Sequence, residues 1–182
     1  VGGNLVATTD AANGVITMDG LRVDGTVQLT TNGSGNATVV NDAGLNFAAS
    51  TVGGNLIATT DAGNGLINLG SLAVDGTVQL TTHGSGDATV VNDAGLTFAA
   101  STVGRNLVAT ATTGDITDDG VLTIAGTSSF TTSQNNADII LNNANAFTGT
   151  VALNTSGADG HATVVDASGL DLGASTVGGN LI

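Results

Sequence analysis

The sequence lacks six amino acids altogether: cysteine, proline, tryptophan, tyrosine, lysine and glutamate. Without cysteine, the chain can form neither disulfides nor thiolate metal sites, although this absence assigns no compartment. Without tryptophan or tyrosine, and with only four phenylalanines, it offers no aromatic platform for a sugar ring. No apolar run approaches the length of a membrane-spanning helix, so we expect no membrane insertion.

Charge of one sign dominates what remains. All 15 acidic residues are aspartates, and Arg22 and Arg105 are the only basic side chains, giving a formal net charge of −13. Two arginines cannot neutralise a phosphate backbone, which excludes nucleic acid as a partner, and the same balance disfavours anionic membranes. High charge with few aromatics occurs in disordered chains. Here 41% of the residues are hydrophobic and regularly spaced, so we expect a folded chain.

Internal repeats organise the whole chain. The phrase TVGGNLI occurs at 51–57 and again at 176–182, with near copies at 1–6 and 102–108. Aligned on their valines, these copies lie 51, 51 and 74 residues apart. Similar segments open with threonine at intervals of 23 to 26 residues. The distances of 51 and 74 residues between copies therefore correspond to two and three coils of about 25 residues each. Coils are predicted to begin near 1, Thr26, Thr51, Thr77, Thr102, Thr127 and Thr150, with an eighth starting at Thr176.

Each unit contains three short apolar runs separated by glycine, asparagine, aspartate or serine, which favour turns. In the second unit these runs are TVQLTT, NATVV and GLNFAAS, which have the length of strands. The last run of each unit alternates between apolar and outward-facing residues, as a strand that covers a core does. The inward pairs are Leu21/Val23, Leu45/Phe47, Leu72/Val74, Leu96/Phe98, Leu122/Ile124 and Leu170/Leu172. The pattern predicts an all-β protein: one triangular parallel β-solenoid domain over residues 1–182, with three strands per coil and about seven coils. Right-handed connection is the strong default.

Two features qualify this picture. Asn145 takes the place that Leu21 has in the first unit, so its inward amide must bond to the backbone or to its neighbours. The chain also begins and ends on the same phrase without a polar cap, although solenoids normally cap their terminal coils. We therefore expect an excerpt from a longer solenoid, whose targeting signals lie elsewhere. The alternative is a subunit that stacks end to end with copies of itself.

The histidines and arginines exchange with neutral turn residues in the other copies. His83 replaces Asn32, His161 matches Asn36, and Arg105 stands where other copies have glycine. A solvated turn tolerates such exchanges, so we expect surface positions without a catalytic role. Asn32, Asn36 and Asn154 begin N-glycosylation triplets, a weak signal in a chain this rich in Asn, Thr and Ser.

The aspartates suggest two kinds of chemistry. The stretch GDITDDG brings Asp115, Asp118 and Asp119 together, and paired carboxylates can hydrolyse glycosides. Arg105 is the only candidate partner for such a site. Calcium also favours clustered oxygens, but the calcium-binding nonapeptide repeat is absent. Turn aspartates such as Asp42, Asp61 and Asp93 are expected to form Asx-turns or caps. We therefore predict no catalytic, metal-binding or cofactor-binding residues and no enzyme activity.

The phrases ADIILNNANAFTGTVAL, TIAGTSSFTT and ASTVGGNL resemble repeats of large bacterial surface proteins of the filamentous-haemagglutinin, or β-strand-repeat, type. The resemblance implies export by two-partner secretion or an autotransporter, folding outside the cell as a right-handed β-helix, and a role as an adhesin or fibrous stalk. It carries no active-site residues.

We therefore expect an extracellular structural or adhesive protein at a bacterial cell surface. Its outward strand faces, for example around Gln28 and Gln79, would contact copies of the chain or surface and matrix glycans. Three alternatives stand beside this hypothesis. The stretch could be a plain spacer, or a segment of a carbohydrate-active β-helix enzyme or phage tail spike. Regular threonines also suggest ice binding, but they mark coil starts, so we expect no two-column array and no thermal hysteresis.

Overall fold

The computed structural model describes residues 1–182 and consists of strands and turns, without a helix. Its strands form two sheets. Sheet 1 contains β1 (Leu5–Ala12), β3 (Thr26–Asn32), β5 (Leu45–Phe47), β6 (Ser50–Val52), β8 (Ile67–Val74), β10 (Ala88–Asn92), β13 (Leu107–Ala111), β16 (Ser128–Asn135) and β18 (Val151–Ser156). Sheet 2 contains β2 (Ile16–Leu21), β4 (Ala37–Asn41), β7 (Leu56–Gly63), β9 (Thr77–His83), β11 (Leu96–Phe98), β12 (Ser101–Val103), β14 (Ile116–Asp118), β15 (Leu122–Ile124), β17 (Ile139–Phe147) and β19 (Ala162–Asp166).

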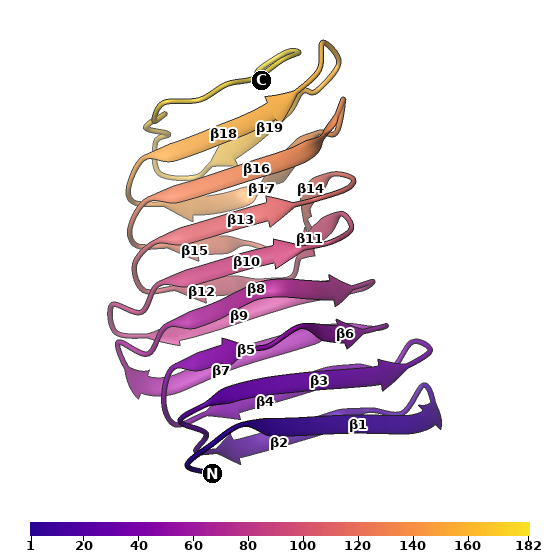
Figure 1. Ribbon diagram of the computed structural model, residues 1–182. Helices are drawn as coiled ribbons and strands as arrows, with labels where there is room; N and C mark the ends of the chain where they lie inside the picture. Colours follow the sequence, from indigo (N-terminus) through magenta and orange to yellow (C-terminus); the bar gives the residue numbers. More distant parts are fainter.

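The chain climbs by alternating between the two sheets. In Figure 1 the strands of sheet 1 run from left to right in front, and those of sheet 2 return behind them, as the colour passes from indigo at the bottom to yellow at the top. Neighbouring strands within each sheet are parallel. This path is a right-handed parallel β-solenoid, as the sequence predicts.

The coil itself differs from the prediction. Residues that pair between neighbouring coils are 19 apart where Ala37 meets Leu56 and 23 apart where Ile116 meets Ile139. A coil is therefore about 21 residues long rather than about 25, and the chain forms about eight coils. Each coil crosses two sheets rather than three faces, so the predicted triangular section is wrong. Three strands per coil are present only where one passage is broken in two, at β5/β6, β11/β12 and β14/β15. The predicted coil starts do not stack either, since Thr51 pairs with Thr30 and not with Thr26.

A half-coil is defined here as one passage of the chain across one sheet together with the turn that follows. The distance between copies of the repeated phrase is a whole number of half-coils. The repeated phrase forms β1, then β7 five half-coils later, then β13 after five more. Its last copy lies seven half-coils beyond β13, where Leu181 bridges to Ala162 of sheet 2. Both 51 residues over five half-coils and 74 over seven give between 10 and 11 residues each. Because five and seven are odd, successive copies lie on opposite sheets.

The interior is a single layer of apolar side chains between the sheets. The alternating strands bury Leu29, Leu56, Leu80 and Leu107 completely or almost completely, and the inward pairs predicted from the sequence are buried in most coils. The last pair, Leu170 and Leu172, is exposed. Three phenylalanine rings pack edge to face in the upper coils, with centroids 6.4 Å apart for Phe98–Phe130 and 6.0 Å for Phe130–Phe147. Such contacts add to the stabilisation from burial.

Polar side chains inside the solenoid connect strands to turns within one coil and also connect neighbouring coils. Inward threonines donate their hydroxyl hydrogen to a turn carbonyl four or five residues later in the chain: Thr31, Thr60, Thr82, Thr132 and Thr155. Inward serines at 50, 101 and 175 instead accept the backbone N–H of Leu29, Leu80 and Leu153 in the preceding coil. These bonds satisfy backbone groups that the interrupted ladders leave without a strand partner.

The turns stack as closely as the strands. The backbone N–H of Asn106 donates to the Asp87 carboxylate of the preceding coil at 3.0 Å. The side-chain oxygen of Asn106 accepts the N–H of Thr127 in the following coil at 2.9 Å, so this residue links three successive coils. Glycine allows this spacing. A Cβ added to Gly53 would overlap the carbonyl oxygen of Gly33, which itself has a φ of 63°.

Candidate functional site

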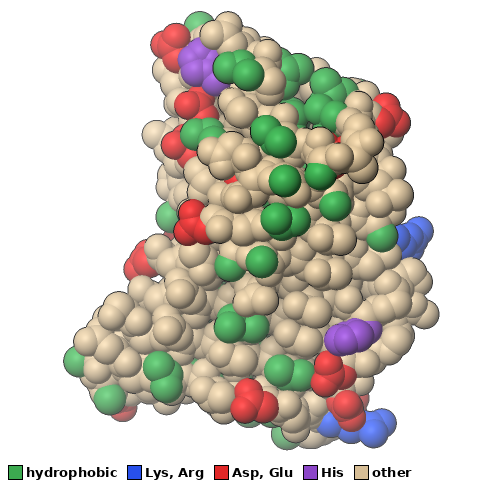
Figure 2. All heavy atoms as spheres, turned by 180° about the vertical axis from the view of Figure 1, so that it is seen from behind, with side chains coloured by type: hydrophobic (Ala, Val, Ile, Leu, Met, Phe, Trp, Pro, Cys, Tyr) green, Lys and Arg blue, Asp and Glu red, His purple; other side chains and the backbone are tan.

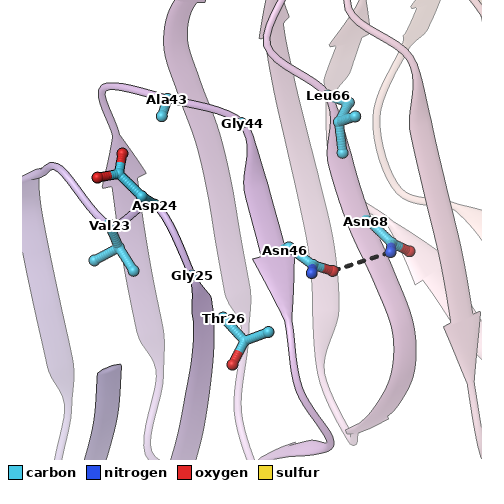
Figure 3. A pocket seen from close by; sticks show the side chains of 9 residues that line it. All are labelled: Val23, Asp24, Gly25, Thr26, Ala43, Gly44, Asn46, Leu66 and Asn68. Atoms are coloured by element: carbon cyan, nitrogen blue, oxygen red, sulfur yellow. Dashed lines mark hydrogen bonds between the residues drawn. The ribbon is translucent and has the colours of Figure 1, made fainter. Parts of the chain in front are cut away.

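Two hollows lie beside each other on the outside of sheet 1. The larger, about 520 Å³, lies where three turns enter β3, β5 and β8. Figure 3 shows Asp24 and Thr26 on one side of it, Leu66 and Asn68 on the other, and Asn46 between them. The Nδ2 of Asn68 donates to Oδ1 of Asn46 at 3.0 Å. The hollow therefore combines a carboxylate, a hydroxyl, a pair of amides and an apolar wall, because Leu66 is 51% exposed.

The second hollow, about 360 Å³, lies further along the same strands. Gln28, Thr30, Thr51, Ser71 and Asp93 supply its polar atoms. The Nε2 of Gln28 donates to the carbonyl of Ala49 at 3.1 Å, which fixes the amide across the hollow. The two hollows together are called the sheet 1 groove below.

Small residues and broken strands create this groove. Sheet 1 is interrupted between β5 and β6, and the pairing of β8 with β10 shifts between Val90 and Asn92. The small residues of the lining lie in the turns before β3 and β5 and at these interruptions, and they are Gly25, Ala43, Gly44, Ala49 and Ser71. These residues have small side chains or none, so they form the bottom of the hollows. The longer side chains of the amide residues and of Leu66 form the sides.

The internal repeat provides a second copy of the larger hollow, and that copy is altered. Thr97 and Thr117 stand where the first copy has Asn46 and Asn68, and their hydroxyls bond to each other at 2.9 Å. Asp115 stands where the first copy has Leu66, because Leu45 and Leu96 donate their N–H groups to the carbonyls of these two residues. The Asp115 carboxylate accepts the N–H of Asp138 at 2.7 Å. Neither hollow in the structure lies at this second copy.

The two histidines connect neighbouring coils. The Nδ1 of His83 lies 2.7 Å from the carbonyl of Thr60 and donates to it, as the Nδ2 of Asn32 donates to Asp10 in the first repeat. The Nδ1 of His161 accepts the N–H of Asn180 at 2.8 Å. Each histidine therefore performs the bonding of an asparagine, which explains why repeats exchange the two. The two imidazoles make opposite use of Nδ1, which donates in His83 and accepts in His161.

Arg105 and the acidic stretch GDITDDG do not form a common site. Arg105 makes an exposed contact of 3.4 Å with Asp87. Asp118 points into the core, where its carboxylate accepts the N–H of Asn142 at 2.9 Å and the Nδ2 of Asn145 at 2.7 Å. Asn145 also accepts the N–H of Leu122 at 2.7 Å. Its predicted inward bonding to backbone and neighbours is confirmed.

Threonines stack more than expected on sheet 2. Thr59, Thr81, Thr102 and Thr123 pair in one column, and Thr77, Thr97 and Thr117 in another. The expectation that no second column would form is wrong for these coils. Above β9 the strands between the columns are broken, between β11 and β12 and again at Asp119 and Gly120 between β14 and β15, so the array is not continuous. We retain the prediction of no thermal hysteresis.

The outer face of sheet 2 carries few charges. Figure 2 shows it as mainly neutral polar and backbone atoms, with apolar side chains scattered singly and acidic ones toward its margins. Gln79 lies on this face, whereas its repeat equivalent Gln28 lies on sheet 1. The two glutamines selected from the sequence are therefore on opposite faces of the solenoid.

Comparison with known proteins gives one match. A family model described as repeats of unknown function (DUF5649) matches residues 85–154, from the turn before β10 into β18. No curated protein and no solved structure matches the chain. None of its segments forms a helix that could cross a membrane.

Proposed function

We propose that the chain is a non-enzymatic part of an extracellular structural or adhesive protein, forming a rigid rod, stalk or fibre at a bacterial cell surface. The observation that supports this most directly is the pair of outer faces, where uncharged amide and hydroxyl side chains stack coil upon coil around one continuous core. A parallel solenoid is stiff along its axis because every coil bonds to the coils above and below it. The resemblance of its phrases to surface-protein repeats supports the location.

The test uses purified chain coupled to beads and exposed to bacterial cells, host cells and immobilised polysaccharides. The adhesive function predicts saturable retention that depends on the number of chains per bead. Soluble chain should compete for the same surfaces. No retention on any surface would contradict adhesion and leave a plain spacer, which imaging of the native material by electron cryo-microscopy would show as uniform rods.

The carbohydrate-active alternative predicts a different result in the same assay. An enzyme would release reducing ends from a bound polysaccharide, and Asp118→Ala or Asp119→Ala would abolish the release. The core position of Asp118 argues against a direct role, since its carboxylate is occupied by bonds to Asn142 and Asn145. We therefore expect no release by the native chain.

A further inference from the structure

We propose that the larger hollow of the sheet 1 groove binds a neutral pyranose of a surface glycan, an inference that rests on the adhesive function proposed above. Asn46 and Asn68 would bind sugar hydroxyls, Asp24 would accept hydroxyl hydrogens, and Leu66 would cover the C–H face of the ring.

The amide pair leaves suitable groups open. The bond between Asn68 and Asn46 uses one hydrogen of the Asn68 amide and the oxygen of Asn46. The Nδ2 group of Asn46 and the Oδ1 atom of Asn68 make no hydrogen bond within the protein. An amide can donate and accept at neighbouring positions, which is what adjacent sugar hydroxyls require. The fixed pair therefore presents donors and an acceptor without first having to be ordered.

The size and pitch of the hollow fit a glycan. Its volume of about 520 Å³ lies within the range of small-molecule sites. Its lining strands β3, β5 and β8 belong to three consecutive coils, whose spacing is about 4.8 Å. A pyranose unit in an extended glycan has nearly this length. A single pyranose is therefore long enough to reach the amides of both β5 and β8.

Charge selects the class of sugar. Asp24 lines the larger hollow and Asp93 the smaller one, and no arginine lines either. The chain as a whole carries a net charge of −13. Sulfated, phosphorylated or sialylated glycans would be repelled, and this repulsion would weaken with added salt. The groove is open and has no aromatic ring, so we expect a dissociation constant on the order of 1 mM for one site, with avidity arising from many chains on a surface.

The second copy supplies the natural control for this inference. There, the hydroxyls of Thr97 and Thr117 stand in place of both amides and bond to each other, and Asp115 stands in place of the apolar wall. Both copies pair their strands in the same register, Leu45 with Ile67 and Leu96 with Ile116. The triple variant N46T/L66D/N68T therefore converts the first copy into the second one with side chains that this fold already accommodates.

The experiment titrates the isotopically labelled native chain with methyl glycosides of glucose, galactose, mannose and N-acetylglucosamine, using NMR signals of the Asn side-chain amides and Leu methyl groups. We expect saturable shifts at Asn46, Asn68 and Leu66 with at least one of these sugars. The triple variant should bind at least tenfold more weakly. Asp24→Asn should weaken binding without altering thermal unfolding. The matched control, T97A/T117A in the second copy, should bind as the native chain does.

The outcomes separate this inference from the function on which it rests. Beads that still adhere to cells after N46T/L66D/N68T would overturn the groove while leaving the adhesive function in place. Shifts located on sheet 2, or stronger binding of sulfated than of neutral sugars, would overturn the site or the ligand class. Retention on no surface, together with no shifts, would overturn both. Unfolding of the triple variant would be visible in its spectrum, and the smaller change Leu66→Ala would then decide.

Discussion

At the scale of single residues, the inside of this solenoid depends on polar groups that are nearly all paired, the hydroxyls of Thr9 and Ser128 being the exceptions. Asn145 is fully buried, and its two ends serve the Leu122 N–H and the Asp118 carboxylate. Asp118 has no cationic neighbour in this network and is held by backbone and amide donors alone. Removing one member leaves the others buried without partners, which costs more than the bond itself contributes.

Asn145→Leu restores the apolar residue that other repeats carry at this position, and we still expect it to destabilise the chain. The change leaves the Leu122 N–H unpaired and removes one donor from the Asp118 carboxylate, at a cost of about 3 kcal/mol. Urea unfolding followed by circular dichroism would measure it. Asn143→Ala, at the rim of the same network, should cost less than half as much. Equal losses for the two variants would contradict the network.

Gly53 tests the close stacking of turns. Its Cβ would overlap the carbonyl oxygen of Gly33, whereas a Cβ on Gly63 would meet nothing within 4 Å. We expect Gly53→Ala to destabilise the chain by about 3 kcal/mol through forced displacement of the neighbouring turn. Gly63→Ala should change stability by less than about 0.5 kcal/mol. Thermal unfolding of both variants measures the difference, and similar melting temperatures would show that the turns can separate.

At the scale of strands, adjacent threonines have opposite roles. Thr82 points inward, donates to the Gly86 carbonyl at 3.1 Å and accepts the Gly104 N–H at 2.8 Å. Thr81 precedes it and points outward in its column. The sequence pair TT does not reveal this difference, because threonine suits both faces of a strand. This is one reason why the inward polar bonds could not be predicted, whereas the apolar faces could.

The two threonines therefore give a matched pair of variants. Thr82→Val keeps the shape of the side chain but removes both bonds, and we expect a loss of about 2 kcal/mol. Thr81→Val should be neutral or slightly stabilising, since valine favours strands. Chemical unfolding at constant temperature measures both. If Thr81→Val proved the more damaging, the inward and outward faces of β9 would be wrongly assigned.

At the scale of the whole molecule, the sequence correctly indicates a solenoid but not the size of its coil. Strand-sized runs and their inward residues follow from alternation, which is a local property. The coil length depends on which runs stack, and repeated letters cannot show this when the repeat is an odd number of half-coils. TVQLTT forms β3 on sheet 1 and β9 on sheet 2. The sequence indicates Gln28 of the smaller hollow as an outward contact position, but the larger hollow could not be predicted, since Asn46 and Asn68 become neighbours only when coils are about 21 residues long.

Deleting parts of the repeat distinguishes the two coil lengths. Removing residues 52–102 takes out five half-coils and joins Thr51 to Val103, which recreates the native phrase TVG. We expect a folded solenoid about 12 Å shorter, since two and a half coils are lost at about 4.8 Å each.

Removing residues 27–51 takes out 25 residues, one coil by the sequence prediction, but about four more than one coil of the structure. This second deletion joins Thr26, at the start of β3, to Val52, at the end of β6, and leaves the passage across sheet 1 about four residues short, so it should melt at a clearly lower temperature. Small-angle scattering gives the lengths and circular dichroism the melting curves. If the 25-residue deletion were as stable as the native chain and the 51-residue deletion were not, the coil would have the length that the threonine spacing suggests.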